Sequence, residues 1–213
     1  MDITLSQKFM ACELRIFESK LEKSYSLIKK ELFSKINKNS KVLEIGPGTG
    51  VNFKYYPKKL KLIVIEPNKL LHARLHKNAL SSGIQLKILS ESSEHLPFSN
   101  AKFNFVISTL VLCSVHNLHH TLNEIKRVLK DRGKFLFIEH VLDEHNSLRR
   151  ITQNIASNRL WRFFGDNCHP NRRLKKAIQS AEFKKLQVKE YLQEGLGLLG
   201  RIIKSHIVGS ATK

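Results

Sequence analysis

Apolar positions along the chain follow two periodicities that alternate with each other. Residues 5–33 carry apolar side chains at helical spacing, with Phe9 and Leu27 among them, which predicts one or two amphipathic helices. Strand-like apolar runs then occur at 41–46, 61–65, 84–89, 103–108 and 134–139. Helical patterns separate these runs at about 50–57, 68–81 and 117–130. The order predicts βαβ units around a parallel sheet, and two last runs, at 183–192 and about 201–208, predict a closing antiparallel hairpin.

Three glycines at alternate positions follow the first strand-like run. Gly46, Gly48 and Gly50 let the backbone turn sharply and approach a ligand closely, and we expect the following helix to present its free N–H groups to that ligand. A glycine-rich turn alone also fits many strand-to-helix junctions. The spacing G-x-G-x-G, with the acid Glu44 two residues earlier, differs from the G-x-G-x-x-G of nicotinamide and flavin sites.

A second acid closes the second strand-like run. Glu66 follows residues 61–65, at a position where a carboxylate can accept hydrogen bonds from both hydroxyls of a ribose. The same carboxylate would repel a 2′-phosphate. Glu44, the glycine turn and Glu66 together predict a cofactor that contains an unphosphorylated ribose.

These residues resemble the first motif of the class I S-adenosylmethionine-dependent methyltransferases, which is E-x-G-x-G-x-G with an acid closing the next strand. The resemblance implies an α/β, Rossmann-like fold with a mostly parallel seven-stranded sheet, helices on both faces and N-terminal lid helices. It also implies S-adenosyl-L-methionine as cofactor and S-adenosyl-L-homocysteine as product. The cofactor-binding residues that it implies are Glu44, Gly46, Gly48, Thr49, Gly50, Asn52, Glu66, Pro67, Asn68, Ser92, Ser93, Glu94, Thr109 and Leu110.

Later segments match the same family with some departures. Residues 92–98 resemble the segment that lies along the adenine, but Ser92 stands where many relatives have aspartate, so backbone groups are expected to recognise the base. Residues 108–115 would face the methionine end of the cofactor near Leu110. Residues 124–133 resemble the helix end E-x-x-R-V-L-K-P-G-G, with Asp131 and Lys134 in place of the proline and the second glycine. Ala181-Glu182-Phe183 replaces an A-G-F turn.

The downstream residues resemble one branch of the family, the alkyl-thiol methyltransferases. Gln153, Trp161, Arg162, residues 165–169 and Arg172 follow in that group's order. The resemblance implies a small, apolar acceptor, with a thiol as the leading candidate. Trp161, Phe163 and Phe164 are candidates for the wall of an acceptor pocket, or for the core.

Two histidines are candidates for the catalytic step. A thiol reacts as its thiolate, so a base would help, and His116 and His140 follow the fourth and fifth strands on the cofactor side of such a sheet. Each histidine also fits a capping or core-edge role. Cys168 and His169 are adjacent, but no further ligands lie at recognisable spacing, so the sequence predicts no metal site and these two are interpreted as shaping the acceptor pocket.

Length and composition limit the alternatives. A chain of 213 residues is expected to form one domain, with lid helices at 1–36, a cofactor core at 37–140 and a substrate region with the hairpin at 141–213. No run approaches the length of a transmembrane helix, and three widely spaced cysteines suit a reducing compartment, so we expect a cytoplasmic protein.

The formal charge of +19 is the strongest anomaly of the composition, although lysines and arginines are spread over most elements. It leaves open RNA as a partner, peripheral contact with an anionic membrane, and a non-catalytic binding protein. RNA is disfavoured, because residues 108–111 lack the [N/D]-P-P-[F/Y/W] motif of enzymes that methylate base amino groups. Methylation of a quinone or a lipid head group is a further alternative, since that branch shares the first motifs.

Overall fold

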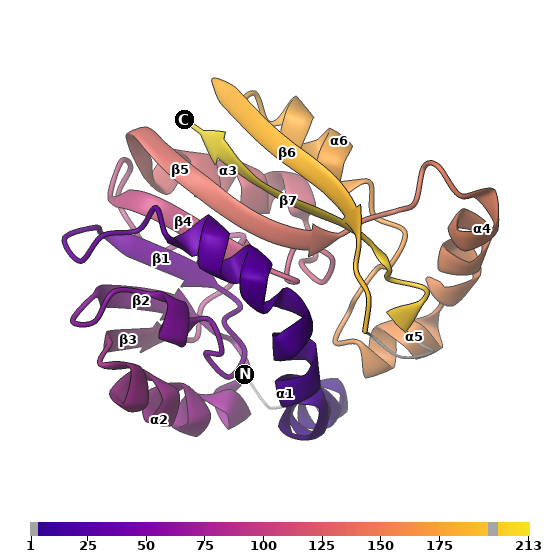
Figure 1. Cartoon of the computed structure of the whole chain (residues 1–213), viewed down its shortest axis with the longest axis horizontal. Coiled ribbons are helices and arrows are strands. Elements are labelled where there is room, and N and C mark those ends of the chain that lie inside the picture. Colours follow the sequence, from indigo (N-terminus) through magenta and orange to yellow (C-terminus); the bar gives the residue numbers. More distant parts are fainter. Residues whose placement is uncertain (1–3, 196–199) are drawn as a thin grey trace.

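A computed structural model of the chain describes residues 4–195 and 200–213, with the side chains of residues 15–21 left out. Its helices are α1 (Leu5–Phe33), α2 (His72–Ser82), α3 (Leu118–Val128), α4 (Ser147–Ala156), α5 (Arg159–Phe164) and α6 (Leu174–Ser180), with short 3-10 helices η1 (Phe53–Tyr55) and η2 (Lys69–Leu71). Its strands are β1 (Val42–Ile45), β2 (Lys61–Ile65), β3 (Gln85–Leu89), β4 (Phe103–Thr109), β5 (Leu129–His140), β6 (Lys185–Leu192) and β7 (Ser205–Thr212). Figure 1 shows the strands side by side in one sheet, with α4 and α5 projecting from one end.

The seven strands have the order β3-β2-β1-β4-β5-β7-β6. Strands β1 to β5 pair in parallel, and β7 pairs antiparallel with both β5 and β6. The chain leaves β1 toward β2 on one side and later returns to place β4 on the other side of β1. The carboxyl ends of β1 and β4 therefore flank a point where the winding direction reverses, which is where open α/β sheets bind ligands.

Alternate strand residues supply two separate cores, one on each face of the sheet. Leu43 and Ile45 pack in the core that also holds residues of α3 and α6, such as Ile125 and Ile178. Val42 packs in the other core, with residues of α1 and α2. Burial on both faces explains why the strands read as continuous apolar runs. The predicted Rossmann-like fold, with its parallel sheet, helices on both faces and final hairpin, is confirmed.

Several predicted elements were wrong in detail. The strand expected at 134–139 is β5 (Leu129–His140), which begins five residues earlier, where the helix expected at 117–130 has already ended at Val128. The helix expected at 50–57 is only the 3-10 helix η1, because Tyr56 precedes Pro57 and takes an extended conformation, which ends any helix. The last strand is Ser205–Thr212 rather than 201–208. Its second half is made of small residues: a Cβ at Gly209 would lie 2.2 Å from the Gln187 carbonyl oxygen and 2.7 Å from the Phe137 ring. The pattern of apolar residues therefore missed the second half of this strand.

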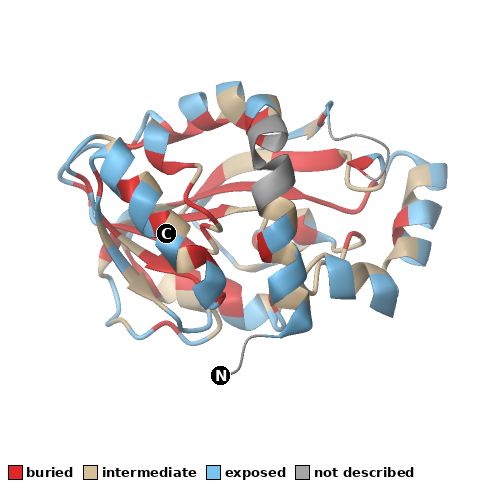
Figure 2. Ribbon diagram, turned by 90° about the horizontal axis from the view of Figure 1, so that it is seen from below, coloured by how far each residue is buried: buried red, intermediate tan, exposed pale blue. Residues whose placement is uncertain are grey.

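The N-terminal segment is one long helix. Thr4 caps α1, accepting a hydrogen bond from Gln7 N while the Gln7 side chain accepts from Thr4 N. Leu27, which the helical pattern placed on the buried face, is 82% exposed. Figure 2 shows exposed and buried positions alternating along the helices. Within the described residues, no helix is both long and apolar enough to span a bilayer.

The turn before β6 contains a strained residue that offers a test of the fold. Glu182, which replaces glycine in the related A-G-F turn, has φ +53°. A left-handed conformation costs a residue with a Cβ about 1–2 kcal/mol. Glycine avoids this cost, but part of the gain is lost because glycine gives up more conformational freedom on folding. We expect Glu182→Gly to raise stability by about 0.5–1 kcal/mol and Tm by roughly 2–4 °C in thermal unfolding.

Alanine is the matched control at this position. The side-chain amine of Lys126 donates to the Ala181 and Glu182 carbonyl oxygens, which are backbone atoms that both variants keep. Glu182→Ala keeps the Cβ and should gain nothing. Equal stabilisation by glycine and alanine would show that charge, rather than backbone strain, is the cause.

Candidate functional site

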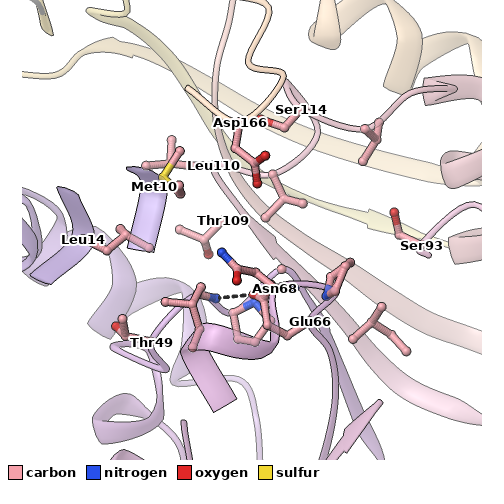
Figure 3. Close-up of a pocket in the computed structure, with 18 of the residues that line it drawn as sticks. Met10, Leu14, Thr49, Glu66, Asn68, Ser93, Thr109, Leu110, Ser114 and Asp166 are labelled. Atoms are coloured by element: carbon pink, nitrogen blue, oxygen red, sulfur yellow. Dashed lines mark hydrogen bonds between the residues drawn. The ribbon is translucent and has the colours of Figure 1, made fainter. Parts of the chain in front are cut away.

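A cleft of about 450 Å³ opens at the carboxyl ends of β1 and β4. One wall is the glycine turn after β1, the next is the end of β2 with residues 66–68, and the third is the end of β4 with the loop that follows it. Figure 3 shows Glu66, Asn68 and Thr109 around this space, with Met10 and Leu14 of α1 at its edge. The cleft thus occupies the switch point that the strand order defines.

The glycine turn has the backbone that the motif predicts. Gly46, Gly48 and Gly50 have φ of +57°, +61° and +85°. A Cβ on Gly46 would lie 2.6 Å from Val111, and one on Gly50 would lie 2.6 Å from the Phe53 ring. No α-helix follows, however, so the expected row of free helical N–H groups is absent here; the Gly48 N–H instead donates to Glu66.

Glu66 lies on the cleft and is held by backbone. Its carboxylate accepts from Gly48 N at 3.1 Å and from Asn68 N at 2.9 Å, one bond to each oxygen. Each oxygen keeps a second acceptor position. Burial raises the pKa of Glu66 to about 7 against the lowering effect of these two bonds. The side chain can therefore accept two further hydrogen bonds at neutral pH and above.

Glu44 is fully buried and organises the floor of the cleft. It accepts from Asn52 Nδ2 at 2.6 Å and from the Tyr56 hydroxyl at 2.9 Å. Burial raises the pKa of Glu44 to about 7, although both hydrogen bonds lower it. The Asn52 amide also donates to the Thr109 hydroxyl at 3.2 Å. Its Oδ1, in contrast, is buried with no hydrogen-bond partner among the described atoms, which leaves an acceptor on a cleft-lining residue.

The loop after β4 is fixed from beneath by Glu139 of β5. This carboxylate, 0% exposed, accepts from Val111 N at 3.1 Å, from Leu112 N at 3.2 Å and from the Ser108 hydroxyl. Leu110 just before them has φ +58° and lines the cleft. The predicted residues of the opposite wall, Ser92, Ser93 and Glu94, line the cleft too, and Glu94 accepts from Asn117 N at 2.9 Å.

Twelve of the fourteen predicted cofactor residues line the cleft. The other two, Glu44 and Gly50, lie behind the lining and act through the contacts just described.

The two predicted catalytic histidines differ in their position relative to the cleft. His116 is exposed and lines the rim of the cleft. His140 is 2% exposed, is not part of the lining, and has its Nε2 3.3 Å from the Cys168 sulfur. The predicted aromatic wall is absent from the lining as well, and Phe163 and Phe164 are each 37% exposed.

Residues that the sequence did not indicate also line the cleft. Glu22, Tyr25 and Lys29 come from the buried face of α1, and Asp166 and Asn167 come from the loop after α5. Lys29 Nζ pairs with Glu22 at 2.5 Å, and burial lowers the pKa of Lys29. The sequence signal that could have indicated these α1 residues is a pair of opposite charges, Glu22 and Lys29, seven residues apart on the helical face that also carries Tyr25.

Helix α1 is joined to both sides of the cleft. Ser6 Oγ donates to the Phe163 carbonyl oxygen at 2.6 Å, and it also contacts Asp166 Oδ1 at 3.2 Å. On the other side, Asn68 Nδ2 donates to the Gln7 carbonyl oxygen at 2.9 Å. The start of α1 therefore lies over the cleft, in the place that the predicted lid would take.

The strand order, the glycine turn and the acid at the end of β2 together define the class I methyltransferase architecture. A family model described as a methyltransferase domain matches residues 17–188. Human thiol S-methyltransferase TMT1A is 32% identical over 194 residues, which cover 87% of this chain and 78% of that protein. Rat thiol S-methyltransferase TMT1B is 31% identical over 191 residues, covering 83% and 78%. The chain belongs to the S-adenosylmethionine-dependent methyltransferase family.

Solved structures agree on the fold. An S-adenosylmethionine-dependent methyltransferase from Thermotoga maritima superposes with a TM-score of 0.61 at 19% identity, covering 94% of this chain and 98% of its own. The [4+2]-cyclase SpnF superposes with a TM-score of 0.69 at 13% identity, covering 88% and 80%. Since a chain named for a cyclisation shares the fold, the fold alone does not define the acceptor.

Proposed function

We propose that this methyltransferase transfers the methyl group of S-adenosyl-L-methionine to a small, apolar thiol. The observation that carries the proposal is the shared cleft of the glycine turn and Glu66, at the switch point of the sheet. The thiol is supported by the two thiol S-methyltransferases, whose similarity extends over most of this chain.

The residues of the cleft fit such a cofactor chemically. Glu66 has two free acceptor positions for ribose hydroxyls, and Asn52 Oδ1 is an unpartnered acceptor for an N–H donor such as the cofactor's ammonium group. Gly46 and Gly48 place backbone on the lining of the cleft. Ser92, Ser93 and Glu94 are proposed to border the adenine, and Thr109 and Leu110 the methionine end.

The bound cofactor supplies a methyl group on a sulfonium, which is already a good leaving group. The protein therefore needs to align the acceptor, exclude water and provide a place for the acceptor's proton. Helix α1 covers the cleft through its contacts to Asp166 and Asn68, which would limit the access of water. His116 is the histidine on the lining, so we propose it as the proton acceptor, in preference to His140.

His116→Ala tests this assignment. We expect turnover with a thiol to fall roughly tenfold to a hundredfold at pH 7, while affinity for the cofactor stays nearly unchanged. The defect should shrink as pH rises above the pKa of the acceptor thiol, because the thiolate then forms without a base. The check is a pH profile of turnover for both proteins. His119→Ala, an exposed histidine outside the lining, is the control, and a defect in His116→Ala that persists at high pH would rule out proton transfer.

The acceptor itself is tested with a panel. Transfer of labelled methyl is measured to an alkyl thiol, hydrogen sulfide, a quinol and bulk RNA, at two salt concentrations. The proposal predicts transfer to a thiol that persists at high salt. Methylation of the quinol would favour the quinone alternative. That alternative is suggested by a ubiquinone/menaquinone C-methyltransferase of Rickettsia prowazekii, which is 28% identical over 112 residues that cover 48% of this chain. RNA labelling that is lost with salt would give the +19 charge a function.

A further inference from the structure

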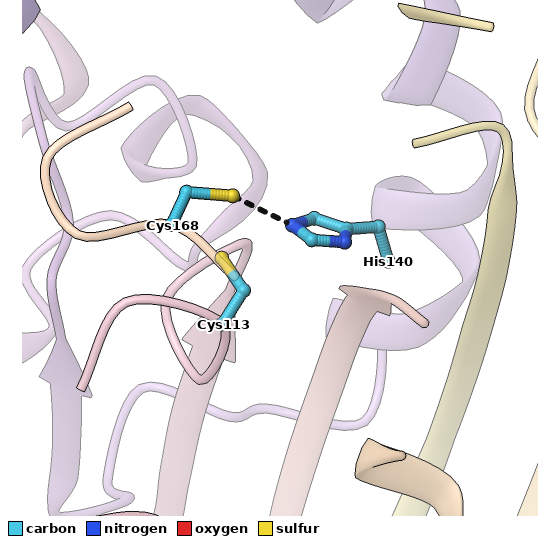
Figure 4. Close-up of side chains that lie close together, drawn as sticks. All are labelled: Cys113, His140 and Cys168. Atoms are coloured by element: carbon cyan, nitrogen blue, oxygen red, sulfur yellow. Dashed lines mark hydrogen bonds between the residues drawn. The ribbon is translucent and has the colours of Figure 1, made fainter. Parts of the chain in front are cut away.

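Three side chains with metal-binding atoms meet behind the wall of the cleft. Cys113 lies in the loop after β4, His140 is the last residue of β5, and Cys168 lies in the loop between α5 and α6. Their two sulfurs and one imidazole nitrogen all lie within 4.8 Å of one another. Figure 4 shows the Cys168 sulfur directed at His140 Nε2, 3.3 Å away, with the Cys113 sulfur beside them. Spacing along the chain gave no sign of this group.

The separations suit one tetrahedral ion. Zinc binds thiolate sulfur at about 2.3 Å and imidazole nitrogen at about 2.0–2.1 Å, so neighbouring ligand atoms around it lie roughly 3.4–3.8 Å apart. The distance of 3.3 Å between the Cys168 sulfur and His140 Nε2 is close to this ligand–ligand separation. Small side-chain rotations would bring the Cys113 sulfur to the same distance from both atoms. Two sulfurs and one nitrogen are also the soft donor set that selects zinc over magnesium or calcium.

The surrounding backbone holds the three residues in place. His169 N donates to the Cys113 carbonyl oxygen at 3.0 Å, which joins the two segments that carry the cysteines. The Arg172 guanidinium donates to the carbonyl oxygens of Leu112 and Val115, on either side of Cys113. His140 lies in β5, where it is paired with His206 of β7. A site on such fixed elements loses little conformational freedom when it binds a ligand.

We propose that Cys113, His140 and Cys168 form a binding site for a thiophilic divalent cation of the zinc class, with two thiolates, one imidazole and a fourth position open. Two thiolates neutralise a divalent ion, so the charges nearby, those of the partly buried Arg172 and the buried Glu139, need not change. Each cysteine is adjacent in sequence to a cleft-lining residue, Ser114 or Asn167. Three protein ligands with one open position is the arrangement of catalytic rather than structural zinc sites. Metal binding itself does not depend on the identity of the methyl acceptor.

The test uses the full chain, with any affinity tag removed, purified under reducing conditions without chelator. Metal content is measured by mass spectrometry, and Co²⁺ is titrated into the demetallated protein. We expect about one zinc per chain, and a cobalt complex with sulfur-to-metal charge-transfer absorption and the strong visible bands of tetrahedral geometry. Cys113→Ser, Cys168→Ser and His140→Asn should each weaken cobalt affinity by more than about a hundredfold. Cys12→Ser, an exposed cysteine on α1, should leave it unchanged.

Folding and cofactor binding are monitored separately, so that failure of this proposal is distinct from failure of the proposed function. Circular dichroism and calorimetry with S-adenosyl-L-homocysteine report whether each variant keeps its fold and its cleft. If a variant does not fold, the proposal is tested instead by alkylating the cysteines of the wild type with and without zinc. Zinc should protect Cys113 and Cys168 from alkylation and leave Cys12 reactive. The proposal is overturned if the reduced wild type binds neither metal, if the serine variants keep full cobalt affinity, or if Cys113 and Cys168 form a disulfide despite excess zinc.

Discussion

Replacing Glu66 with alanine is expected to weaken binding of S-adenosyl-L-methionine by about 1–3 kcal/mol, which is roughly 5- to 150-fold in Kd. The carboxylate is fixed by Gly48 N and Asn68 N and retains one free acceptor position on each oxygen for a ribose hydroxyl. Alanine removes both charge-assisted bonds to the ligand. Calorimetric titration of the cofactor into the wild type and the variant measures the difference, and equal affinities would mean that the ribose binds elsewhere.

The same side chain should make affinity depend on pH. Burial raises the pKa of Glu66 to about 7, and the ionised form is the one that accepts from both hydroxyls. As pH falls below about 7, the proton must be released before the ligand binds, so affinity should drop by up to about tenfold per pH unit. Titration with S-adenosyl-L-homocysteine between about pH 5.5 and 8 measures this slope. Glu66→Gln should bind weakly with a flatter profile, and the same slope in that variant would assign the titration to another group.

Replacing Glu139 with alanine is expected to be strongly destabilising. Its carboxylate accepts from Val111 N, Leu112 N and the Ser108 hydroxyl, and the side chain is 0% exposed. Alanine leaves three donors without their acceptor in a buried site and creates a cavity. Each buried unsatisfied group costs about 1–3 kcal/mol, so we expect a loss of roughly 3–5 kcal/mol in the free energy of unfolding.

Urea unfolding measures this loss, and glutamine is the matched control. Glu139→Gln keeps the shape and one acceptor oxygen, so it should cost less than half as much as alanine. Because the bonds from Glu139 fix the loop that contains Leu110, both variants should also bind the cofactor more weakly at a temperature where they remain folded. A loss below about 1 kcal/mol in Glu139→Ala would mean that water or another group replaces the carboxylate.

The sequence predicted the fold well because the main determinants are local. The apolar runs and the glycine turn are visible in the local sequence, so strands β1 to β4 were placed within two residues at either end. The failures have two causes, a local signal that was missed and strand pairing that local sequence does not report. Tyr56 cannot stay helical before Pro57, and the small residues of β7 pair with two neighbours without adding hydrophobicity.

The site was predictable only where a motif linked residue and role. Glu66 and the glycines are recognisable because their spacing in the chain is set by one strand-turn-strand unit. Which histidine reaches the cleft depends on the direction of a side chain, and His140 is turned toward Cys168. Cys113, His140 and Cys168 come from three segments, so no spacing rule could bring them together. The division of the chain into lid, core and substrate region stays a prediction.

A crystal structure of the full chain with S-adenosyl-L-homocysteine tests the central claim most directly. We predict density in the cleft, with both ribose hydroxyls on the Glu66 carboxylate, the homocysteine end against the glycine turn and Leu110, and the adenine beside Ser92 and Ser93. A ligand seated away from Glu66, or a cleft that stays empty while the ligand binds at another surface, would contradict the account.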